Sequence, residues 1–194
     1  TYNANLEQIS KAIGQKTKGI FLAHTLGNPY DVEALAELAE KHDLFLIEDC
    51  CDALGSEYKG RKVGTFGHVT TFSFYPAHHI TLGEGGAVGT NDDTIAKAIK
   101  SLRDWGRDCY CSSGENNTCG KRFTGQYGTL PVGYDHKYVY SHIGYNLKAT
   151  DMQAAIGVEQ LKKLPDFCQA RKENFKIWSA GFEKWQDFFI LPEA

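Results

Sequence analysis

The sequence predicts an α/β fold, a mostly parallel sheet flanked by helices, from three observations. Residues 19–23 and 44–47 are short apolar runs without alternation, as expected of strands buried on both faces. Between them, apolar side chains recur at helical spacing over residues 32–39. A strand, a helix and a second strand joined by so short a crossover form the repeating unit of a parallel sheet.

The other regular elements of the first half follow in chain order. The helix between the first two strands is expected to begin near Asn28 and Pro29, with Asn as N-cap and Pro at the first helical position. Residues 69–74 and 86–89 are predicted as a third and a fourth strand. A helix over residues 91–102 should follow, because its acidic residues stand at the favourable N-terminal end.

The second half begins with a segment of different character. Residues 106–140 are rich in Gly, Tyr, Cys and small polar residues and have no sustained period, which predicts a long structured loop or insertion. Thr150 and Gln153 fit a capping box at the start of a long helix, which Pro165 should bend or interrupt. Three apolar residues of that helix are expected to face inward: Met152, Ile156 and Leu161.

Composition limits the classes of function. The chain has 194 residues, 24 acidic and 21 basic, and a net charge of −3, so it lacks the basic footprint of nucleic-acid or anionic-membrane binding. It has no apolar run of membrane-spanning length and no signal-peptide pattern, and we expect a cytoplasmic protein. Its abrupt ends suggest a piece of a longer polypeptide. Six cysteines in such a chain favour metal binding over disulfides.

Polar residues follow two of the predicted strands, where parallel sheets bind ligands. A carboxylate among Glu48, Asp49 and Asp52 could hold a cofactor ring nitrogen protonated, although a capping or loop role explains such residues equally well. The hydroxyl of Ser73 suits a phosphate oxygen. A histidine at position 78 or 79 is expected to act as an acid or base, since adjacent residues of an extended segment point in opposite directions and suit a shared metal poorly.

Four motifs together resemble the sugar aminotransferases of the DegT/DnrJ/EryC1/StrS family, which are vitamin-B6 enzymes that modify nucleotide-linked keto sugars. The motifs are Ile47-Glu-Asp-Cys-Cys-Asp-Ala-Leu-Gly55, Phe72-Ser-Phe-Tyr-Pro76, Gly83-Glu-Gly-Gly86 and Gly144-Tyr-Asn-Leu-Lys148. The resemblance implies the central part of a fold-type I, PLP-dependent aminotransferase large domain. Residues 1–164 would form part of this cofactor-binding domain, with residues 106–140 as a cysteine-bearing insertion. Residues 165–194 would lead to a missing C-terminal small domain, and the full-length protein would be a homodimer.

The same resemblance assigns the cofactor contacts. It implies Asp49 at the pyridine nitrogen, Asp52 near the ring, Ser73 at the cofactor phosphate and Asn146 at the phosphate in the partner subunit's site. The family's Schiff-base lysine should stand at position 78, where this sequence has a histidine, which lacks a primary amine.

His78 can still move a proton, so the resemblance implies bound pyridoxamine 5′-phosphate, the amine counterpart of PLP, as in the 3-dehydrases of deoxysugar biosynthesis. Tyr75 would assist His78 or tune its pKa, although a packed aromatic residue explains it equally well.

The cysteines resemble one branch of these 3-dehydrases. Cys51, Cys109, Cys111 and Cys119 have the spacing C-x57-C-x-C-x7-C of the iron–sulfur enzymes that act on CDP-4-dehydro-6-deoxyglucose, which implies a 2Fe–2S cluster. Without the resemblance, zinc or unpaired thiols would explain them as well. Cys50 and Cys168 are expected to be core thiols.

The implied activity is the C3 dehydration and deoxygenation of a nucleotide-linked 4-keto-6-deoxy sugar in 3,6-dideoxyhexose (lipopolysaccharide O-antigen) biosynthesis. An NAD(P)H-dependent flavin iron–sulfur reductase would supply electrons. The alternatives are a related dTDP-sugar 3-dehydrase and a catalytically silent, zinc-stabilised sugar-nucleotide binding protein.

Overall fold

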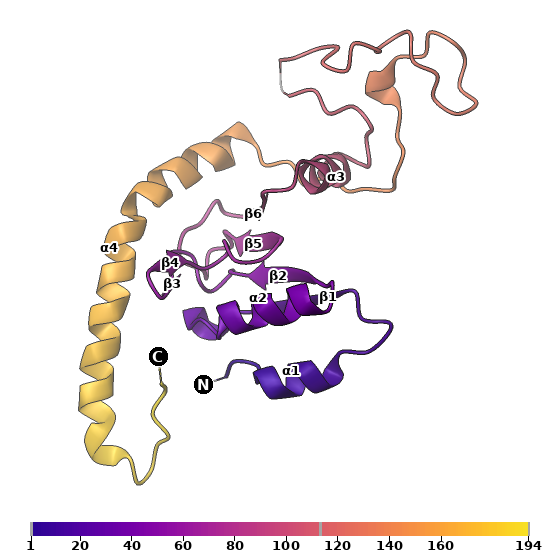
Figure 1. The fold of residues 1–194 in the computed structure, drawn as a ribbon. Coiled ribbons are helices and arrows are strands. Elements are labelled where there is room, and N and C mark those ends of the chain that lie inside the picture. Colours follow the sequence, from indigo (N-terminus) through magenta and orange to yellow (C-terminus); the bar gives the residue numbers. More distant parts are fainter. Residues whose placement is uncertain (1, 113, 194) are drawn as a thin grey trace. The chain divides into compact units, whose positions relative to one another are not determined.

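A computed structural model describes residues 2–112 and 114–193, which form two compact units (Figure 1). The first unit comprises the residues up to Gly89 together with those from Thr150 onward, and the second comprises Thr90–Ala149. No helix among the described residues is both long and apolar enough to cross a membrane.

The first unit contains a four-stranded sheet of order β1-β2-β5-β6, in which β1 is Gly19–Ala23, β2 is Phe45–Asp49, β5 is Val69–Ser73 and β6 is Gly86–Thr90. Strand β2 pairs in parallel with β1 and with β5, with Asp49 opposite Ala23 on one side and Thr71 on the other. These strands confirm the predicted α/β class. A short antiparallel pair, β3 (Glu57–Tyr58) and β4 (Arg61–Lys62), lies between β2 and β5 in the sequence.

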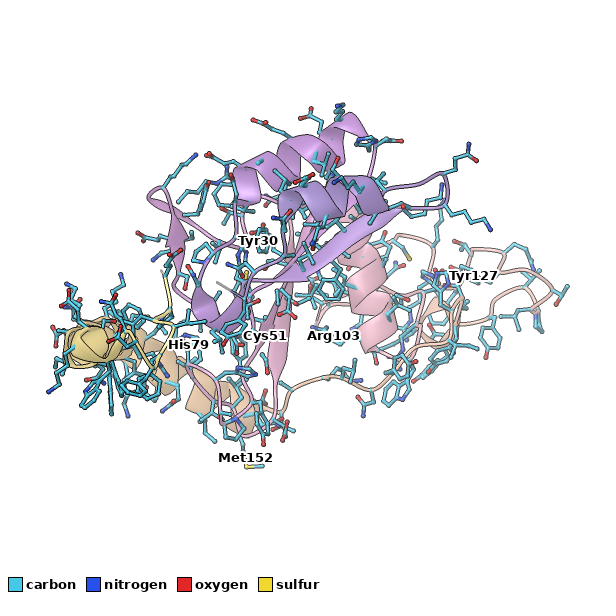
Figure 2. The ribbon with its side chains drawn as sticks, turned by 90° about the horizontal axis from the view of Figure 1, so that it is seen from below. Tyr30, Cys51, His79, Arg103, Tyr127 and Met152 are labelled. Atoms are coloured by element: carbon cyan, nitrogen blue, oxygen red, sulfur yellow. The ribbon has the colours of Figure 1, made fainter. Side chains whose placement is uncertain are left out.

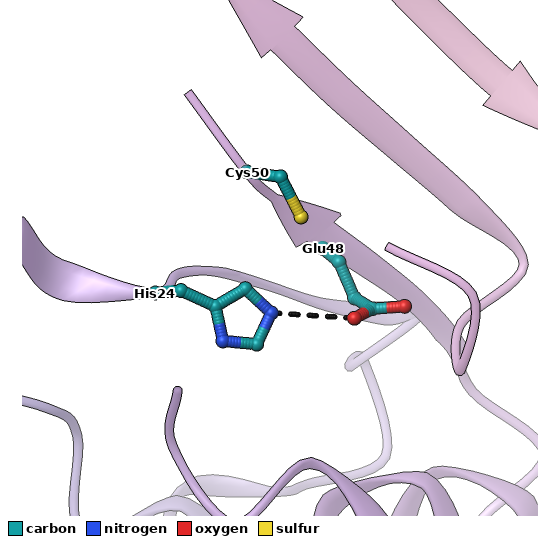
Figure 3. Close-up of side chains that lie close together, drawn as sticks. All are labelled: His24, Glu48 and Cys50. Atoms are coloured by element: carbon teal, nitrogen blue, oxygen red, sulfur yellow. Dashed lines mark hydrogen bonds and ion pairs between the residues drawn. The ribbon is translucent and has the colours of Figure 1, made fainter. Parts of the chain in front are cut away.

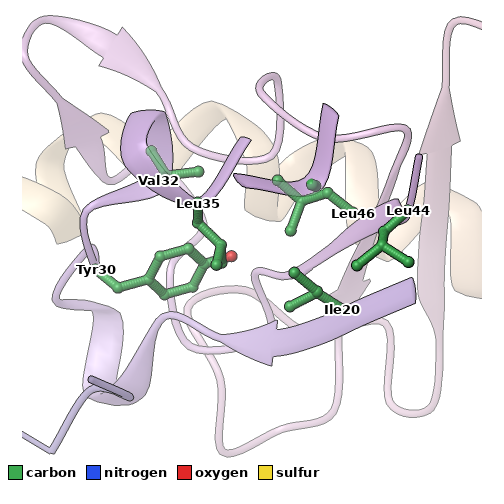
Figure 4. Close-up of a cluster of buried hydrophobic side chains, with 7 residues drawn as sticks. Ile20, Tyr30, Val32, Leu35, Leu44 and Leu46 are labelled. Carbon is green, nitrogen blue, oxygen red and sulfur yellow. The ribbon is translucent and has the colours of Figure 1, made fainter. Parts of the chain in front are cut away.

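Helix α2 (Val32–Lys41) packs on the sheet through its apolar stripe, whose buried side chains Figure 4 shows. Helix α1 (Leu6–Ala12) contacts α2. The buried cluster consists of Ile20, Tyr30, Val32, Leu35, Ala39, Leu44 and Leu46. Burying one such leucine stabilises the fold by about 1.5–3 kcal/mol. The predicted helix start at Asn28 and Pro29 is wrong, because Asp31 is the N-cap and accepts a hydrogen bond from the amide of Ala34 at 3.2 Å.

Helix α4 (Asp151–Phe182) begins with the predicted capping box of Thr150 and Gln153 and is followed by the short η3 (Glu183–Trp185). It continues through Pro165 without interruption and curves along its length (Figure 1). The expectation that its apolar residues face inward is wrong. Met152, Ile156 and Leu161 are 78%, 49% and 56% exposed, and Met152 points away from the ribbon (Figure 2).

The second unit contains one regular α-helix among its described residues, α3 (Asp93–Arg103), whose N-cap Asp92 accepts hydrogen bonds from two first-turn amides. The chain after α3 is mostly irregular, as predicted for residues 106–140, and includes the short η2 (His136–Tyr138). Isolated bridges join Asp104 to Asn146 and Arg107 to Tyr140.

Candidate active site and cysteine cluster

The carboxyl ends of β2 and β5 bring two of the predicted cofactor residues to one edge of the sheet. Asp49 ends β2 and Ser73 ends β5, and the two strands are parallel neighbours. The carboxylate of Asp49 accepts the backbone N–H of Cys51 at 3.0 Å, and the hydroxyl of Ser73 accepts the backbone N–H of Tyr75 at 3.3 Å. Both side chains are half-buried, and their chemistry suits a protonated ring nitrogen and a phosphate, respectively.

His78 lies beside Asp52, with its Nδ1 3.1 Å from the Oδ1 atom of that carboxylate. The ring of Tyr75 meets the ring of His78 edge-on at a centroid distance of 6.2 Å, and the backbone N–H of His78 donates to the carbonyl of Tyr75 at 3.0 Å. The structure thus brings together Asp52, Tyr75 and His78. Sequence reasoning did not predict the Asp52–His78 pair, since the two residues follow different strands.

A glycine keeps β6 close to this edge. A Cβ atom at Gly86 would lie 2.7 Å from the carbonyl oxygen of Phe72, closer than Cβ atoms approach in proteins. The glycine motif therefore has a packing role next to Ser73. The donor set at the edge, an acid, a hydroxyl and a histidine, fits a vitamin-B6 cofactor.

Three of the four predicted cluster cysteines gather in the second unit. Cys109, Cys111 and Cys119 line one hollow, together with six other residues: Glu115, Asn116, Asn117, Arg122, His136 and Lys137. A hydrogen bond from Thr118 lowers the pKa of Cys111, whereas burial raises the pKa of Cys109. Three thiols line this hollow, and thiols are the ligand type of iron–sulfur clusters.

The fourth predicted ligand, Cys51, belongs to the first unit and follows β2 directly. Burial raises its pKa to about 11, and the neighbouring Asp49 carboxylate contributes to the same shift. Asn146 belongs to the second unit, where its side-chain oxygen accepts a hydrogen bond from the Lys148 ammonium at 2.8 Å.

The two remaining cysteines differ in burial. Cys50 is fully buried beside Ala53 and Val63, as expected of a core thiol, and burial raises its pKa to about 12. The expectation that Cys168 is also a core thiol is wrong, because Cys168 is only half-buried, with its sulfur 3.9 Å from the carbonyl oxygen of Leu54.

His136 is a candidate that sequence reasoning missed. Its Nδ1 lies 3.3 Å from the sulfur of Cys119 and its Nε2 lies 2.7 Å from a carboxylate oxygen of Asp108. Its ring stacks on Tyr127, with centroids 4.6 Å apart. No periodic pattern marks this histidine in the irregular segment, so no sequence signal was available for it.

Among the described residues, three or more possible metal ligands have ligand atoms within 4.8 Å of one another only in the core, where His24, Glu48 and Cys50 meet (Figure 3). The carboxylate of Glu48 accepts hydrogen bonds from the backbone N–H groups of residues 64, 66 and 67 at 2.6–2.8 Å. The Nε2 atom of His24 lies 3.2 Å from the Oε2 atom of Glu48. Hydrogen bonds already occupy both oxygens of Glu48, and burial raises the pKa of the Cys50 thiol. We therefore interpret this group as structural hydrogen bonding and not as a metal site. His24 also stacks on Tyr30 at 4.1 Å, as expected of a structural histidine.

Comparison with known proteins gives consistent matches. The model of the DegT/DnrJ/EryC1/StrS aminotransferase family matches residues 1–194. The chain is 56% identical over 194 residues to the lipopolysaccharide biosynthesis protein RfbH of Salmonella typhimurium and 58% identical over 194 residues to the dTDP-4-dehydro-2,6-dideoxy-D-glucose 3-dehydratase of Saccharopolyspora spinosa. All of the chain is covered in both matches, but only 44% and 42% of the relatives, so the chain spans less than half of their length.

A solved structure shares the fold. The chain superposes on the E coli GDP-4-keto-6-deoxy-D-mannose-3-dehydratase with bound hydrated PLP with a TM-score of 0.76. The two chains are 29% identical, and the match covers 93% of this chain and 44% of that one.

Proposed function

Because the chain belongs to the DegT/DnrJ/EryC1/StrS aminotransferase family and has the α/β fold of its solved relatives, we propose that it carries much of the active site of a nucleotide-sugar 3-dehydratase. The reaction would be C3 dehydration and deoxygenation of a nucleotide-linked 4-keto-6-deoxy sugar in deoxysugar and lipopolysaccharide biosynthesis. The observation that carries this proposal is His78, paired with Asp52, at the position where the family resemblance implies a lysine. The names of two relatives, a lipopolysaccharide biosynthesis protein and a 3-dehydratase, support it.

The proposed cofactor is pyridoxamine 5′-phosphate. Asp49 would hold its pyridine nitrogen protonated, Ser73 would bind its phosphate and Asn146 would reach the phosphate in the partner subunit's site of a homodimer. When bound, the cofactor supplies a primary amine to the sugar ketone and a ring that accepts electrons. The bound PLP named for the E coli relative supports a B6 vitamer here.

His78 would carry the proton at the cofactor's C4′ atom. A carboxylate only accepts hydrogen bonds, so an Nδ1–H of His78 would be donated to the Oδ1 atom of Asp52 at the observed 3.1 Å. The opposite nitrogen, Nε2, is then left with a lone pair that can take the proton. Tyr75 would restrict the rotation of the His78 ring through its edge-on contact.

Cys51, Cys109, Cys111 and Cys119 are the proposed ligands of a 2Fe–2S cluster that passes single electrons from an NAD(P)H-dependent flavin iron–sulfur reductase. The proposed substrate is CDP-4-dehydro-6-deoxyglucose. A dTDP sugar is the second candidate, favoured by the relative that is named for one.

The experiment replaces His78 with lysine in the full-length protein and adds PLP, with His79→Lys as the matched control. Borohydride treatment should fix PLP covalently to the lysine at position 78 and not to that at position 79, as read by peptide mass spectrometry. Labelling of neither variant, or of both equally, refutes the site.

Metal analysis of the wild-type protein tests the cluster. Two iron and two sulfide per chain are expected. A colourless protein with stoichiometric zinc would refute the electron-transfer part and favour a silent binding protein.

A further inference from the structure

Asn146 lies on a stretch of chain whose backbone is fixed to the residues around the end of α3. It forms an isolated antiparallel bridge with Asp104. The backbone N–H of the neighbouring Tyr145 donates to the carbonyl of Leu102 at 2.8 Å, and the carbonyl of Tyr145 accepts the backbone N–H of Trp105 at 3.0 Å. Main-chain hydrogen bonds therefore set the place of Asn146, and a change of a nearby side chain leaves them intact.

The ammonium of Lys148 contacts three groups in this region. It donates hydrogen bonds to the Oδ1 atom of Asp104 and to the Oδ1 atom of Asn146, both at 2.8 Å. It also lies over the ring of Trp105, 3.7 Å from the ring centroid. The backbone of Trp105 has a φ of 59°, in the left-handed region that few large side chains occupy. A carboxylate, an amide and an aromatic face thus hold the ammonium, although the Lys148 side chain is 38% exposed.

The contact with Lys148 determines which end of the Asn146 amide is available to a ligand. An ammonium has only donors, so it pairs with the amide oxygen and not with the NH₂ group. The NH₂ group at the other end carries two donors, and the side chain is exposed. Because the oxygens of a phosphate dianion only accept hydrogen bonds, this end of the amide is the one that suits a phosphate.

We propose that Lys148 is a positioning residue for the cofactor phosphate, which holds the Asn146 amide with its NH₂ group available to a phosphate oxygen. The inference rests on the proposed function, because it takes Asn146 as the residue that reaches the phosphate in the partner subunit's site. Without the ammonium the amide can turn its oxygen toward the phosphate, where two acceptors would repel each other. Two of the three ammonium donors already have oxygen acceptors, so we expect Lys148 to act through Asn146 and not by a contact of its own.

A double-mutant cycle tests whether Lys148 acts through Asn146. Lys148→Met, Asn146→Ala and their combination are prepared in the full-length protein. The matched control is Lys100→Met, which removes the charge of another exposed lysine of the second unit. Equilibrium dialysis measures the Kd of each protein for pyridoxamine 5′-phosphate and for pyridoxamine, which lacks the phosphate.

We expect Asn146→Ala to raise the Kd for pyridoxamine 5′-phosphate about 10- to 100-fold, because a hydrogen bond to a charged group is lost. Lys148→Met should raise it about 3- to 10-fold, because binding must then order an amide that the ammonium no longer holds. In the Asn146→Ala protein the same substitution should change the Kd less than about twofold. Lys100→Met should bind as the wild type does, and the Kd for pyridoxamine should be the same in all of these proteins.

Three results would overturn the role of Lys148. The first is an unchanged Kd for pyridoxamine 5′-phosphate in Lys148→Met. The second is the same fold-change with and without the Asn146 side chain, which would mean that the ammonium acts on the phosphate directly. The third is an equally large effect on pyridoxamine, which would mean a general disturbance of the protein. Circular dichroism and size-exclusion chromatography check folding and assembly, and Lys148→Ala replaces Lys148→Met in the cycle, with the same expectations, if the methionine variant does not fold.

The same measurements separate this inference from the proposed function. A wild type that does not bind pyridoxamine 5′-phosphate overturns the proposed function and the role of Lys148 with it. An unchanged Kd in Asn146→Ala overturns the assignment of Asn146 and likewise the role of Lys148. A weakened Asn146→Ala protein beside an unaffected Lys148→Met protein overturns the role of Lys148 alone.

Discussion

Replacing Glu48 with glutamine should destabilise the first unit strongly, although the two side chains have nearly the same shape. Both carboxylate oxygens of Glu48 accept hydrogen bonds in the core. Oε1 takes the amides of Phe66 and Gly67, and Oε2 takes that of Gly64 and lies 3.2 Å from the Nε2 atom of His24. If the NH₂ group of the glutamine replaced Oε1, it would face the N–H groups of Phe66 and Gly67. The orientation that loses less stability therefore places the NH₂ group at the position of Oε2.

That orientation sets the size of the effect. The amide of Gly64 loses a charge-assisted bond, which costs about 1.5–3 kcal/mol, and remains as an unpaired buried donor, which adds about 1–3 kcal/mol. His24 can adapt by exposing a lone pair at Nε2. We therefore expect a loss of about 3–5 kcal/mol in the free energy of unfolding, or roughly 6–20 °C in Tm for a domain of 150–250 residues.

Urea unfolding followed by circular dichroism measures this loss, with Glu37→Gln on the exposed side of α2 as the matched control. Burial alone would raise the pKa of Glu48, but hydrogen bonds from His24 and three backbone amides outweigh it, and the pKa is lowered overall. A lowered pKa stabilises the fold above the unfolded value of about 4.3 and loses this contribution as the pH falls below it. The difference between wild type and Glu48→Gln should therefore shrink in acid. A loss below about 1 kcal/mol at pH 7, or one that is independent of pH, would refute this reasoning.

Three further predictions concern the site and the second unit. Asp52→Asn should lower kcat about 10- to 100-fold with little change in KM, because the amide no longer fixes the tautomer of His78. Steady-state kinetics of the full-length enzyme measure both constants, and an unchanged kcat would contradict the prediction. Cys51→Ser should lose iron while Cys50→Ser retains it, as read by metal analysis; equal iron content would contradict the assignment. The Arg122 guanidinium lowers the pKa of Asp135 to about 2, so this pair should stabilise the second unit above about pH 4 and cease to do so as the pH falls toward 2. Near-ultraviolet circular dichroism of wild type and Asp135→Asn should differ in acid sensitivity, and identical acid transitions would contradict the pairing.

Local sequence patterns predicted the four strands of the main sheet and the start of α4, because both depend on neighbouring residues, whereas the short β3 and β4 were not predicted. The capping box of Thr150 is an example, since its two hydrogen-bonding partners lie three residues apart. The start of α2 was missed because tertiary packing decides it. Tyr30 turns into the core and stacks on His24, so the helix begins only after Asp31. Likewise, the spacing of Met152 and its neighbours shows which residues share a helix face but not whether anything covers that face.

Individual candidate residues could be named from the sequence, but the contacts between them could not. Strand ends identified Asp49 and Ser73, because parallel pairing determines where those ends lie. The contacts of His78 with Asp52 and of His136 with Asp108 join residues 26 and 28 positions apart through irregular chain, which no periodicity encodes.

Pro165 removes one hydrogen bond from α4 without interrupting the helix. It has no amide hydrogen, so the carbonyl of Leu161 receives no partner from the helix and one rung of the ladder is missing. Pro165 lies between two contacts of α4. Before it, the side-chain amide of Gln153 donates a hydrogen bond to the carbonyl of Glu84, and after it, the sulfur of Cys168 lies at the carbonyl of Leu54. Each half of the helix thus has its own contact with the rest of the first unit. Replacing Pro165 with alanine would restore the missing hydrogen bond and straighten the helix. The gain in helical stability would be offset by strain at one of these two contacts.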